Sequence, residues 1–353
     1  MKSIYYYMLA GLTLSTTGCS SWLSEDDAPV MSYDYYETEA GVNAAITAAY
    51  GFLRWGVGGE RFDVLTEHGT DLFTEGEDGN HRESYNKYAT QLNPDDGILY
   101  EMWENHYKGI SDANIAMKKI QDSQDLLENV KSQSYAEMQF IRAYLYFDLV
   151  QQFGRIPLVT EGSFDIRTDF KRSPVADIYN LIISDLRNAA ENLPEKVATK
   201  GRATRYSAAH LLAKVYLTRG SAINDPRGQQ TTDMDSTLYY AEKVIDSGAF
   251  TLQDNFASLW DISNQGNSEV VFAVQFTTEP MFNGDGNKQH LFWLSWYEDQ
   301  PGMLRDIANG RPYRRHVATP KTMDDLYDRL HDSRFYKSFK WVYYANNVNT
   351  LPV

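Results

Sequence analysis

Residues 136–149 read AEMQFIRAYLYFDL, and this stretch decides the fold. It forms the centre of a helix that we predict over residues 135–152, because apolar side chains recur there at three- and four-residue spacing. One stripe contains Leu145 and Leu149, and Phe147 belongs to a second stripe. A helix that is apolar on more than one face is typically buried on several sides. We therefore place this helix at the centre of a mostly α-helical protein.

Arg142 and Asp148 are charged residues in the middle and at the end of this apolar stretch. An unpaired charge in a protein interior is costly, so we expect each of them to have a partner. Gly154 ends the helix and Pro157 follows it, an order that is common after helix C-termini.

Periodic segments on both sides of this helix predict further helices. Thr38 is placed to cap the first of them, and Ser173 followed by Pro174 marks another helix start. A run of β-branched and aromatic residues at 269–276 predicts a strand. The predicted helices cover residues 38–54, 98–120, 174–193, 206–218 and 236–247, with a short one at 324–330.

Two regions lack any sustained period. Residues 56–100 and 280–320 are rich in Gly, Asn and Asp and predict loops with short elements inside them. Long irregular stretches in a compact domain are often functional. We therefore look for a binding site in these two regions.

Composition narrows the function classes. The 353 residues are 42% hydrophobic, which is enough for a sizeable core and argues against disorder. The formal net charge of −15 would repel nucleic acid, so we expect no nucleic-acid partner. Aromatic residues make up 14%, with 25 Tyr and 7 Trp. This share suits an extracellular binding protein, because tyrosine offers a large contact area, but it also suits a helical core.

The N-terminus has the layout of an export signal. Lys2 is followed by an apolar run over residues 4–14 and by small residues up to Gly18, just before Cys19. A cysteine in this position resembles a bacterial lipobox, in which the thiol is acylated, for example with palmitate. We therefore predict a lipoprotein signal peptide over residues 1–18. The alternative is an ordinary signal peptide with an incidental cysteine.

An acidic tether follows the predicted lipidation site, over residues 19–33. It resembles the surface-export signal of Bacteroidota lipoproteins. The apolar run at the N-terminus is shorter than the roughly 20 residues that span a bilayer. We therefore expect this chain to be anchored to a membrane by its lipid.

Six segments in order resemble the SusD/RagB-like lipoproteins. The central stretch resembles the family's hallmark "AEarfLRAyyYFdL" helix, and FGRIPLV at 153–159 looks like its "fGdvPLv" turn. The resemblance extends over roughly residues 19–335. A late helix pair of the family has no counterpart here, so the chain is either a short member or a piece of a longer protein. The other four segments are 177–194, 201–217, 241–248 and 267–272.

The resemblance implies a fold and a domain organisation. The fold would be mostly α, with tetratricopeptide-type paired helices, long irregular ligand-binding insertions and a few short strands. Residues 34–260 would form the helical scaffold, with the loop insertion at 56–100. Residues 261–353 would form the variable ligand-binding region.

The resemblance also implies a function. Family members are outer-membrane surface lipoproteins that bind a nutrient, usually a glycan and sometimes a peptide. They deliver it to a TonB-dependent, SusC-like transporter, and they are not known for catalysis or for a cofactor. The expected partners are therefore this transporter, a glycan or peptide ligand, and the outer membrane through the N-terminal lipid.

Aromatic residues in the irregular regions are the candidate ligand contacts. Sugars present C–H faces that pack on flat rings, while their hydroxyls need planar polar groups. The richest cluster spans residues 290–297, and a second lies in the 55–106 region. Any of these rings can instead be core. The candidates are His290, Phe292, Trp293, Trp296 and Tyr297 in the first cluster, and Trp55, Arg82, Tyr85 and Tyr88 in the second.

Three other interpretations remain open. Arg314, with Arg311 and Arg315, can recognise an anionic ligand, or the cluster can be an ion-paired surface. An enzyme is a weaker hypothesis, because the sequence has no GxSxG elbow, phosphate loop or HExxH motif. A pure adaptor would bind only protein through its helix pairs. The acidic turn at 75–80 fits no EF-hand, so we expect no metal site.

Overall fold

We analysed a computed structural model of the chain, which describes residues 38–79, 81–89, 92–162, 167–223, 226–279, 286–340 and 342–351. The predicted signal peptide, Cys19 and the acidic tether lie outside the described residues. No helix in the described part of the chain has the length and apolarity needed to cross a membrane.

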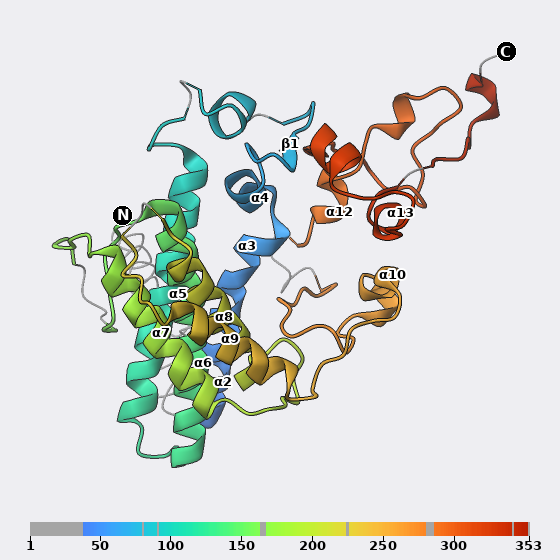
Figure 1. The fold of residues 1–353 in the computed structure, drawn as a ribbon. Coiled ribbons are helices and arrows are strands. Elements are labelled where there is room, and N and C mark those ends of the chain that lie inside the picture. Colours follow the sequence, from blue (N-terminus) through green and yellow to red (C-terminus); the bar gives the residue numbers. More distant parts are fainter. Residues whose placement is uncertain are drawn as a thin grey trace, which may run out of the picture.

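A helical scaffold forms the larger part of the molecule. Each of its long helices packs against the next one along the chain, and α2 packs across α5 and α6. Figure 1 shows these helices side by side, with the C-terminal segments on the opposite side of α3 and α4. The scaffold helices are α2 (Glu39–Gly51), α5 (Gly97–Asp122), α6 (Glu128–Phe153), α7 (Val175–Asn192), α8 (Arg205–Gly220) and α9 (Asp233–Ile245).

Helix α6 is the centre of the scaffold, as its sequence predicted. Fourteen of its residues are buried, including Leu145, Phe147 and Leu149. These residues belong to one large apolar cluster, to which α2, α5, α7 and α8 also contribute. The mostly α, paired-helix fold is therefore confirmed. Burial of this much apolar surface is the main stabilising contribution to such a scaffold.

The two charged residues of α6 singled out from the sequence, Arg142 and Asp148, have partners. The Arg142 guanidinium donates from Nε to Asp185 Oδ2 and from Nη2 to Asp185 Oδ1, each at 2.8 Å, and Nη1 donates to Asn114 Oδ1 at 2.7 Å. Asp148 Oδ2 lies 3.4 Å from His106 Nε2. Arg142 and Asp185 are almost fully buried. The expectation that the charges in this helix are paired is thus confirmed.

The helix starts follow the capping residues in two cases and differ in a third. Thr38 caps α2 by accepting a hydrogen bond from Gly41 N at 3.1 Å, and Thr204 and Ser207 form a capping box on α8. Ser173 was predicted to cap α7, but Pro174 occupies that position. Pro174 is extended, with ψ 144°, so the helix begins one residue later than predicted.

Short elements make up the rest of the molecule. Strands β1 (Phe73–Glu75) and β2 (His316–Ala318) pair antiparallel, with Thr74 opposite Val317, and so join two segments that are distant in the sequence. The other elements are η3 (Phe52–Arg54), α3 (Trp55–Gly58), α4 (Glu60–Thr66), η4 (Arg82–Asn86), α10 (Phe256–Leu259), η5 (Ile262–Asn264), α12 (Gln289–Phe292), η6 (Tyr297–Asp299), η7 (Lys321–Asp325), α13 (Arg334–Ser338) and η8 (Val348–Thr350).

Two predicted elements were wrong. Residues 269–276 form no strand, because no other segment pairs with them in the described part of the chain. Phe272 packs instead against Tyr50 and Phe140 on the helical scaffold, so side-chain packing accounts for the apolar run. The short helix predicted at 324–330 is replaced by a π-helical turn, η7, that begins directly after Pro320.

Candidate functional site

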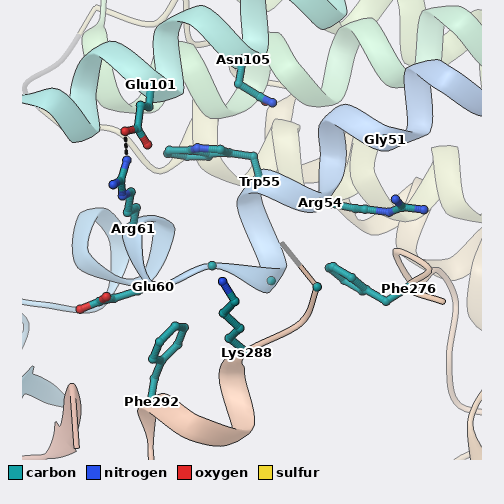
Figure 2. Close-up of a pocket in the computed structure, with 13 residues that line it drawn as sticks. Gly51, Arg54, Trp55, Glu60, Arg61, Glu101, Asn105, Phe276, Lys288 and Phe292 are labelled. Atoms are coloured by element: carbon teal, nitrogen blue, oxygen red, sulfur yellow. Dashed lines mark ion pairs between the residues drawn. The ribbon is translucent and has the colours of Figure 1, made fainter. Parts of the chain in front are cut away.

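A pocket of about 670 Å³ opens where the scaffold meets the short elements. Its walls come from the end of α2, from α3 and α4, from one face of α5, and from the segments around 276 and 286–292. Figure 2 shows Lys288 and Phe292 on one side of Trp55, with Glu101 and Asn105 of α5 on the other. The lining residues are Gly51, Arg54, Trp55, Gly58, Gly59, Glu60, Arg61, Glu101, Asn105, Phe276, Gly286, Lys288 and Phe292.

Glycine allows the pocket walls to approach each other closely. A Cβ atom at Gly58 would lie 2.6 Å from Phe276 Cζ and 3.1 Å from Gly286 O. Only glycine accommodates such an approach without a shift of the neighbouring residues. Gly58 O also accepts a hydrogen bond from Lys288 N at 3.0 Å, which ties the C-terminal segment to α3.

Trp55 provides a flat aromatic surface in the pocket. It is half-buried, and its ring meets Phe62 and His106 at 6.1 Å and 5.6 Å between centroids, both in edge-to-face geometry. In Figure 2 its ring lies between Arg61 on α4 and the side chains of α5. These neighbours hold the ring in place, so the indole is a preorganised surface.

Charged groups around Trp55 are held by ion pairs. Arg61 pairs with Glu101 across the pocket, and Arg315 Nη1 donates to both carboxylate oxygens of Glu60, at 3.0 Å and 2.9 Å. The guanidinium of Arg54 lies 5.8 Å from the ring centroid of Phe276. The pocket therefore presents fixed planar groups with hydrogen-bonding capacity on several sides.

Asn105 adds an acceptor to this wall. Its Oδ1 atom is buried and has no hydrogen-bond partner among the described residues. A buried polar atom without a partner lowers stability, and a ligand that donates a hydrogen bond would remove that cost. Asn105 lies one helical turn after Glu101, so both project from the same face of α5.

A buried polar cluster supports the pocket from behind. His68 Nε2 lies 2.8 Å from His316 Nδ1, and His316 Nε2 lies 3.2 Å from Asp63 Oδ2. Gln289 Nε2 donates to the same Asp63 oxygen at 2.6 Å. Burial and the neighbouring His316 lower the pKa of His68 to about 4. The cluster therefore fastens α12 and β2 onto α4 while His68 is neutral.

Of the candidate residues in the first cluster, 290–297, only Phe292 lines the pocket. Phe292 is buried and lines the pocket, whereas Tyr297 is buried outside it and donates to Gly310 O at 2.6 Å. Trp296 is half-buried and His290 is exposed; neither lines the pocket. Trp293 is 38% exposed and its Nε1 donates to Gln289 Oε1 at 2.8 Å.

The four-residue spacing of Trp293 and Tyr297 does not put them on one element. Helix α12 ends at Phe292, and Trp293 is its C-cap. The ring of Trp293 packs edge-on against Phe73 at 4.9 Å and lies 4.8 Å from His316. Tyr297 stacks instead on Tyr343, at 5.2 Å between centroids.

The described residues of the second cluster also lie in different places. Trp55 lines the pocket, but Tyr85 is buried in a small apolar cluster with Val64 and Ile98. Tyr88 is exposed and has a φ of 51°, in the left-handed region. The side chain of Arg82 lies outside the described part. Neither Tyr85 nor Tyr88 is among the lining residues of the pocket.

Two residues of the arginine cluster, Arg314 and Arg315, are ion-paired, whereas the guanidinium of Arg311 lies 4.9 Å from the ring centroid of Tyr313. Arg314 Nη1 lies 2.9 Å from Glu77 Oε1, and Arg315 binds Glu60 and also approaches Asp78, with 3.6 Å between Nε and Oδ2. The acidic turn at 75–79 therefore lies against these arginines. Among the described residues, no group of three or more metal-ligating side chains converges.

Most of the pocket's polar residues were missed from the sequence. The candidates did not include five of them, because nothing in the local sequence distinguishes these residues from other polar surface residues. The five are Arg54, Arg61, Glu101, Asn105 and Lys288. The one available signal was the four-residue spacing of Glu101 and Asn105 on a predicted helix, which places them on one face. That spacing does not reveal which other segments of the chain lie opposite this helix face.

A protein-family model and several known proteins are similar to this chain. The family model, described as starch-binding and associating with the outer membrane, matches residues 27–217. SusD-like protein P2 of Formosa agariphila is 27% identical over 338 residues, covering 88% of this chain and 63% of that protein. A SusD-like protein of Bacteroides ovatus is 28% identical over 197 residues, covering 55% of this chain and 36% of that protein.

Solved structures share the fold. A laminarin-binding SusD-like protein superposes with a TM-score of 0.69 at 24% identity, covering 85% of this chain and 66% of that one. A structure with a bound xylogluco-oligosaccharide has a TM-score of 0.62 at 22% identity, covering 80% and 54%. The chain thus spans between about a third and two thirds of the length of the curated relatives described here.

Proposed function

Because this chain belongs to the SusD-like family of outer-membrane-associated, starch-binding proteins, we propose that it binds an oligosaccharide in the pocket around Trp55. The binding would serve nutrient uptake at the cell surface. The observation that carries the proposal is the combination of one held aromatic face with fixed polar groups in a single cavity.

The chemistry of the pocket suits a sugar. The Trp55 ring can pack against the C–H face of a pyranose, and the guanidinium of Arg61 and the amide of Asn105 can meet its hydroxyls. A volume of about 670 Å³ lies within the range of roughly 300–1,000 Å³ that is usual for ligand sites. Phe276 and Phe292 would add apolar contacts at the far wall.

The two carboxylates of the pocket, Glu60 and Glu101, favour a binding site over a catalytic one. Glycoside hydrolysis needs one protonated acid and one free carboxylate. In this pocket Glu60 is held by Arg315 and Glu101 by Arg61. Both acids of the pocket are thus already engaged by an arginine, which favours a binding role over a catalytic one.

Similar proteins support a glycan as the ligand class. The fold neighbours include a protein described as laminarin-binding and one solved with a xylogluco-oligosaccharide. We propose a neutral or acidic glucan-type oligosaccharide for this chain. Oligopeptide binding, and an adaptor without a small ligand, are the alternatives that the experiment below separates.

The cellular role follows from the N-terminus and the family. We propose that Cys19 carries the lipid, that the protein lies on the outer membrane, and that it passes its ligand to a TonB-dependent, SusC-like transporter. The export-signal layout before Cys19 and the family's association with the outer membrane support this role.

Isothermal titration calorimetry of the purified protein tests the proposal. The panel would hold β-glucan, xyloglucan and starch oligosaccharides, uronic-acid oligosaccharides and oligopeptides. We expect saturable binding of one glycan class, weakened roughly tenfold or more in Trp55→Ala, because the stacking face is lost. Trp260→Ala is the matched control, since Trp260 is 70% exposed and does not line the pocket.

Three results would contradict the proposal. Binding of peptides but not glycans would replace the ligand class. Glycan binding that survives Trp55→Ala but is lost in Trp293→Ala would move the site to the other tryptophan. A cooperatively folded protein that binds nothing in the panel would favour the adaptor alternative.

A further inference from the structure

A second cavity lies within the helical scaffold. It has a volume of about 330 Å³ and lies between α7, α8 and the segment that leads into α9. Helix α8 packs against both α7 and α9, and Figure 1 shows these helices side by side. It shares no lining residue with the pocket around Trp55. The residues that matter are Asn180, Ser184, Arg187, Tyr216, Arg219 and Gln230.

The two arginines of this cavity differ in their charge partners. Arg219 is buried and forms an ion pair with Asp233, with Nη2 to Oδ1 at 2.5 Å and Nε to Oδ2 at 3.1 Å. Arg187 is exposed, and in the described part of the chain it pairs with no carboxylate. Its guanidinium lies 5.8 Å from the ring centroid of Tyr216. The cavity therefore carries one uncompensated positive charge.

Tyr216 supplies an unused hydrogen-bonding group. Its side chain is 2% exposed, and its ring stacks on Tyr240 with 5.9 Å between centroids. Its hydroxyl is buried and has no hydrogen-bond partner in the described ranges. Buried hydroxyls are normally satisfied, so an unpaired one in a cavity wall leaves a hydrogen bond that a ligand atom can complete.

An uncompensated arginine is notable in this acidic chain. The formal net charge is −15, so most cations have a carboxylate available. A guanidinium matches a carboxylate in shape and can donate two parallel hydrogen bonds to it. The remaining wall offers the amides of Asn180 and Gln230 and the hydroxyl of Ser184, which suit a ligand with several hydroxyl groups.

The volume of the cavity limits the size of the ligand. At roughly 30 Å³ for each water in the liquid, the cavity corresponds to about ten waters, the size of one sugar ring with its substituents. We propose that this cavity is a second binding site, which takes a monosaccharide-sized carboxylic acid of the uronic-acid type. Arg187 and the Tyr216 hydroxyl would donate to the carboxylate, and the polar groups around them would meet the hydroxyls.

The test is a calorimetric titration with glucuronate in a Trp55→Ala background, which separates this site from the pocket around Trp55. We expect saturable binding that Arg187→Gln weakens about tenfold or more, because a charge-assisted contact is lost. Lys214→Gln should leave binding unchanged. It removes the same charge from an exposed position on α8 that does not line the cavity. Glucose should not bind.

Tyr216→Phe gives an independent readout. Because the hydroxyl has no partner in the free protein, its removal should raise the melting temperature without ligand. The same change should reduce the stabilisation by glucuronate, since at a fixed ligand concentration the stabilisation of the folded state rises with the logarithm of the affinity.

Four outcomes would overturn the proposal. They are no glucuronate binding by the folded protein, equal binding of glucose, binding that is unaffected by Arg187→Gln, and inorganic phosphate binding as tightly as glucuronate. The last result would mean a general anion site. A Tyr216→Phe variant less stable than the parent would show that the hydroxyl is satisfied within the protein.

Discussion

The helical scaffold and the pocket region are stabilised in different ways. The scaffold helices bury long apolar faces, and their internal charges, such as Arg142 and Asp185, are paired inside the core. The pocket region consists of short elements joined by polar contacts between distant segments, such as Gln289 with Asp63 and Arg315 with Glu60. The stability of the scaffold should therefore be insensitive to substitutions of surface charges but sensitive to the loss of a buried charge. The pocket region should be sensitive to the loss of single polar contacts and to pH.

The largest effect is expected in the scaffold. Arg142→Ala would leave Asp185 buried without its partner, and we expect a loss of about 3–5 kcal/mol in the free energy of unfolding. Urea denaturation measures the loss. The control is Arg167→Ala, which removes an exposed ion pair with Asp169 and should not shift the transition measurably. A similar loss in both variants would contradict the difference between core and surface pairs.

The pH dependence tests the cluster behind the pocket. The pKa of His68 is lowered to about 4 in the folded protein, from an ordinary value of 6.5. The unfolded chain therefore binds a proton more readily, so stability is present above pH 6.5 and is lost as the pH falls towards 4. The loss is about 3 kcal/mol, at 1.36 kcal/mol for each pKa unit.

Unfolding curves between pH 7 and pH 4 measure this loss. His68→Leu should flatten the pH dependence, because the titrating group is removed. The control is His290→Leu, since His290 is exposed and the same substitution there should leave the pH dependence unchanged. A pH dependence that His68→Leu leaves intact would show that other groups produce it.

A smaller effect is expected from closing the pocket. Gly58→Ala places a methyl group 2.6 Å from Phe276 Cζ, so the walls must move apart at a cost of roughly 1–3 kcal/mol. Ligand binding should weaken more than tenfold, as measured by calorimetry. The matched change is Gly51→Ala in the same pocket wall, where no atom lies within 4 Å of the added carbon. Equal effects of the two changes would argue against the close approach at Gly58.

The smallest effect is expected at Tyr297. Its hydroxyl donates to Gly310 O and accepts from Asp306 N, outside the pocket. Tyr297→Phe should lower the free energy of unfolding by about 1 kcal/mol and leave glycan affinity unchanged. Calorimetry and thermal denaturation of the same sample provide both numbers. A loss of affinity without a loss of stability would return Tyr297 to the binding site.

The same contrast explains what the sequence could predict. The position of α6, the cap at Thr38 and the need to pair Arg142 followed from local spacing and from the cost of buried charge. The family resemblance rested on these helical segments and was confirmed. Local patterns sufficed because a long helix is specified largely by its own residues.

The pocket could be predicted only in part. Trp55 and Phe292 were named as aromatic candidates, but the sequence did not indicate that they line one cavity. That cavity depends on the close approach of Gly58 to Phe276, a contact between distant segments. The spacing of Trp293 and Tyr297 was uninformative because α12 ends at Phe292, before both of them. Residues 269–276 show the same limit, since packing on the scaffold and strand pairing favour the same side chains.

The most direct test is a crystal structure of the protein with the best-binding oligosaccharide from the panel. We expect a sugar ring packed on the face of Trp55, with hydroxyls hydrogen-bonded to Asn105 and Arg61. A sugar bound at Trp293 and Trp296, with the pocket around Trp55 filled only by water, would contradict it.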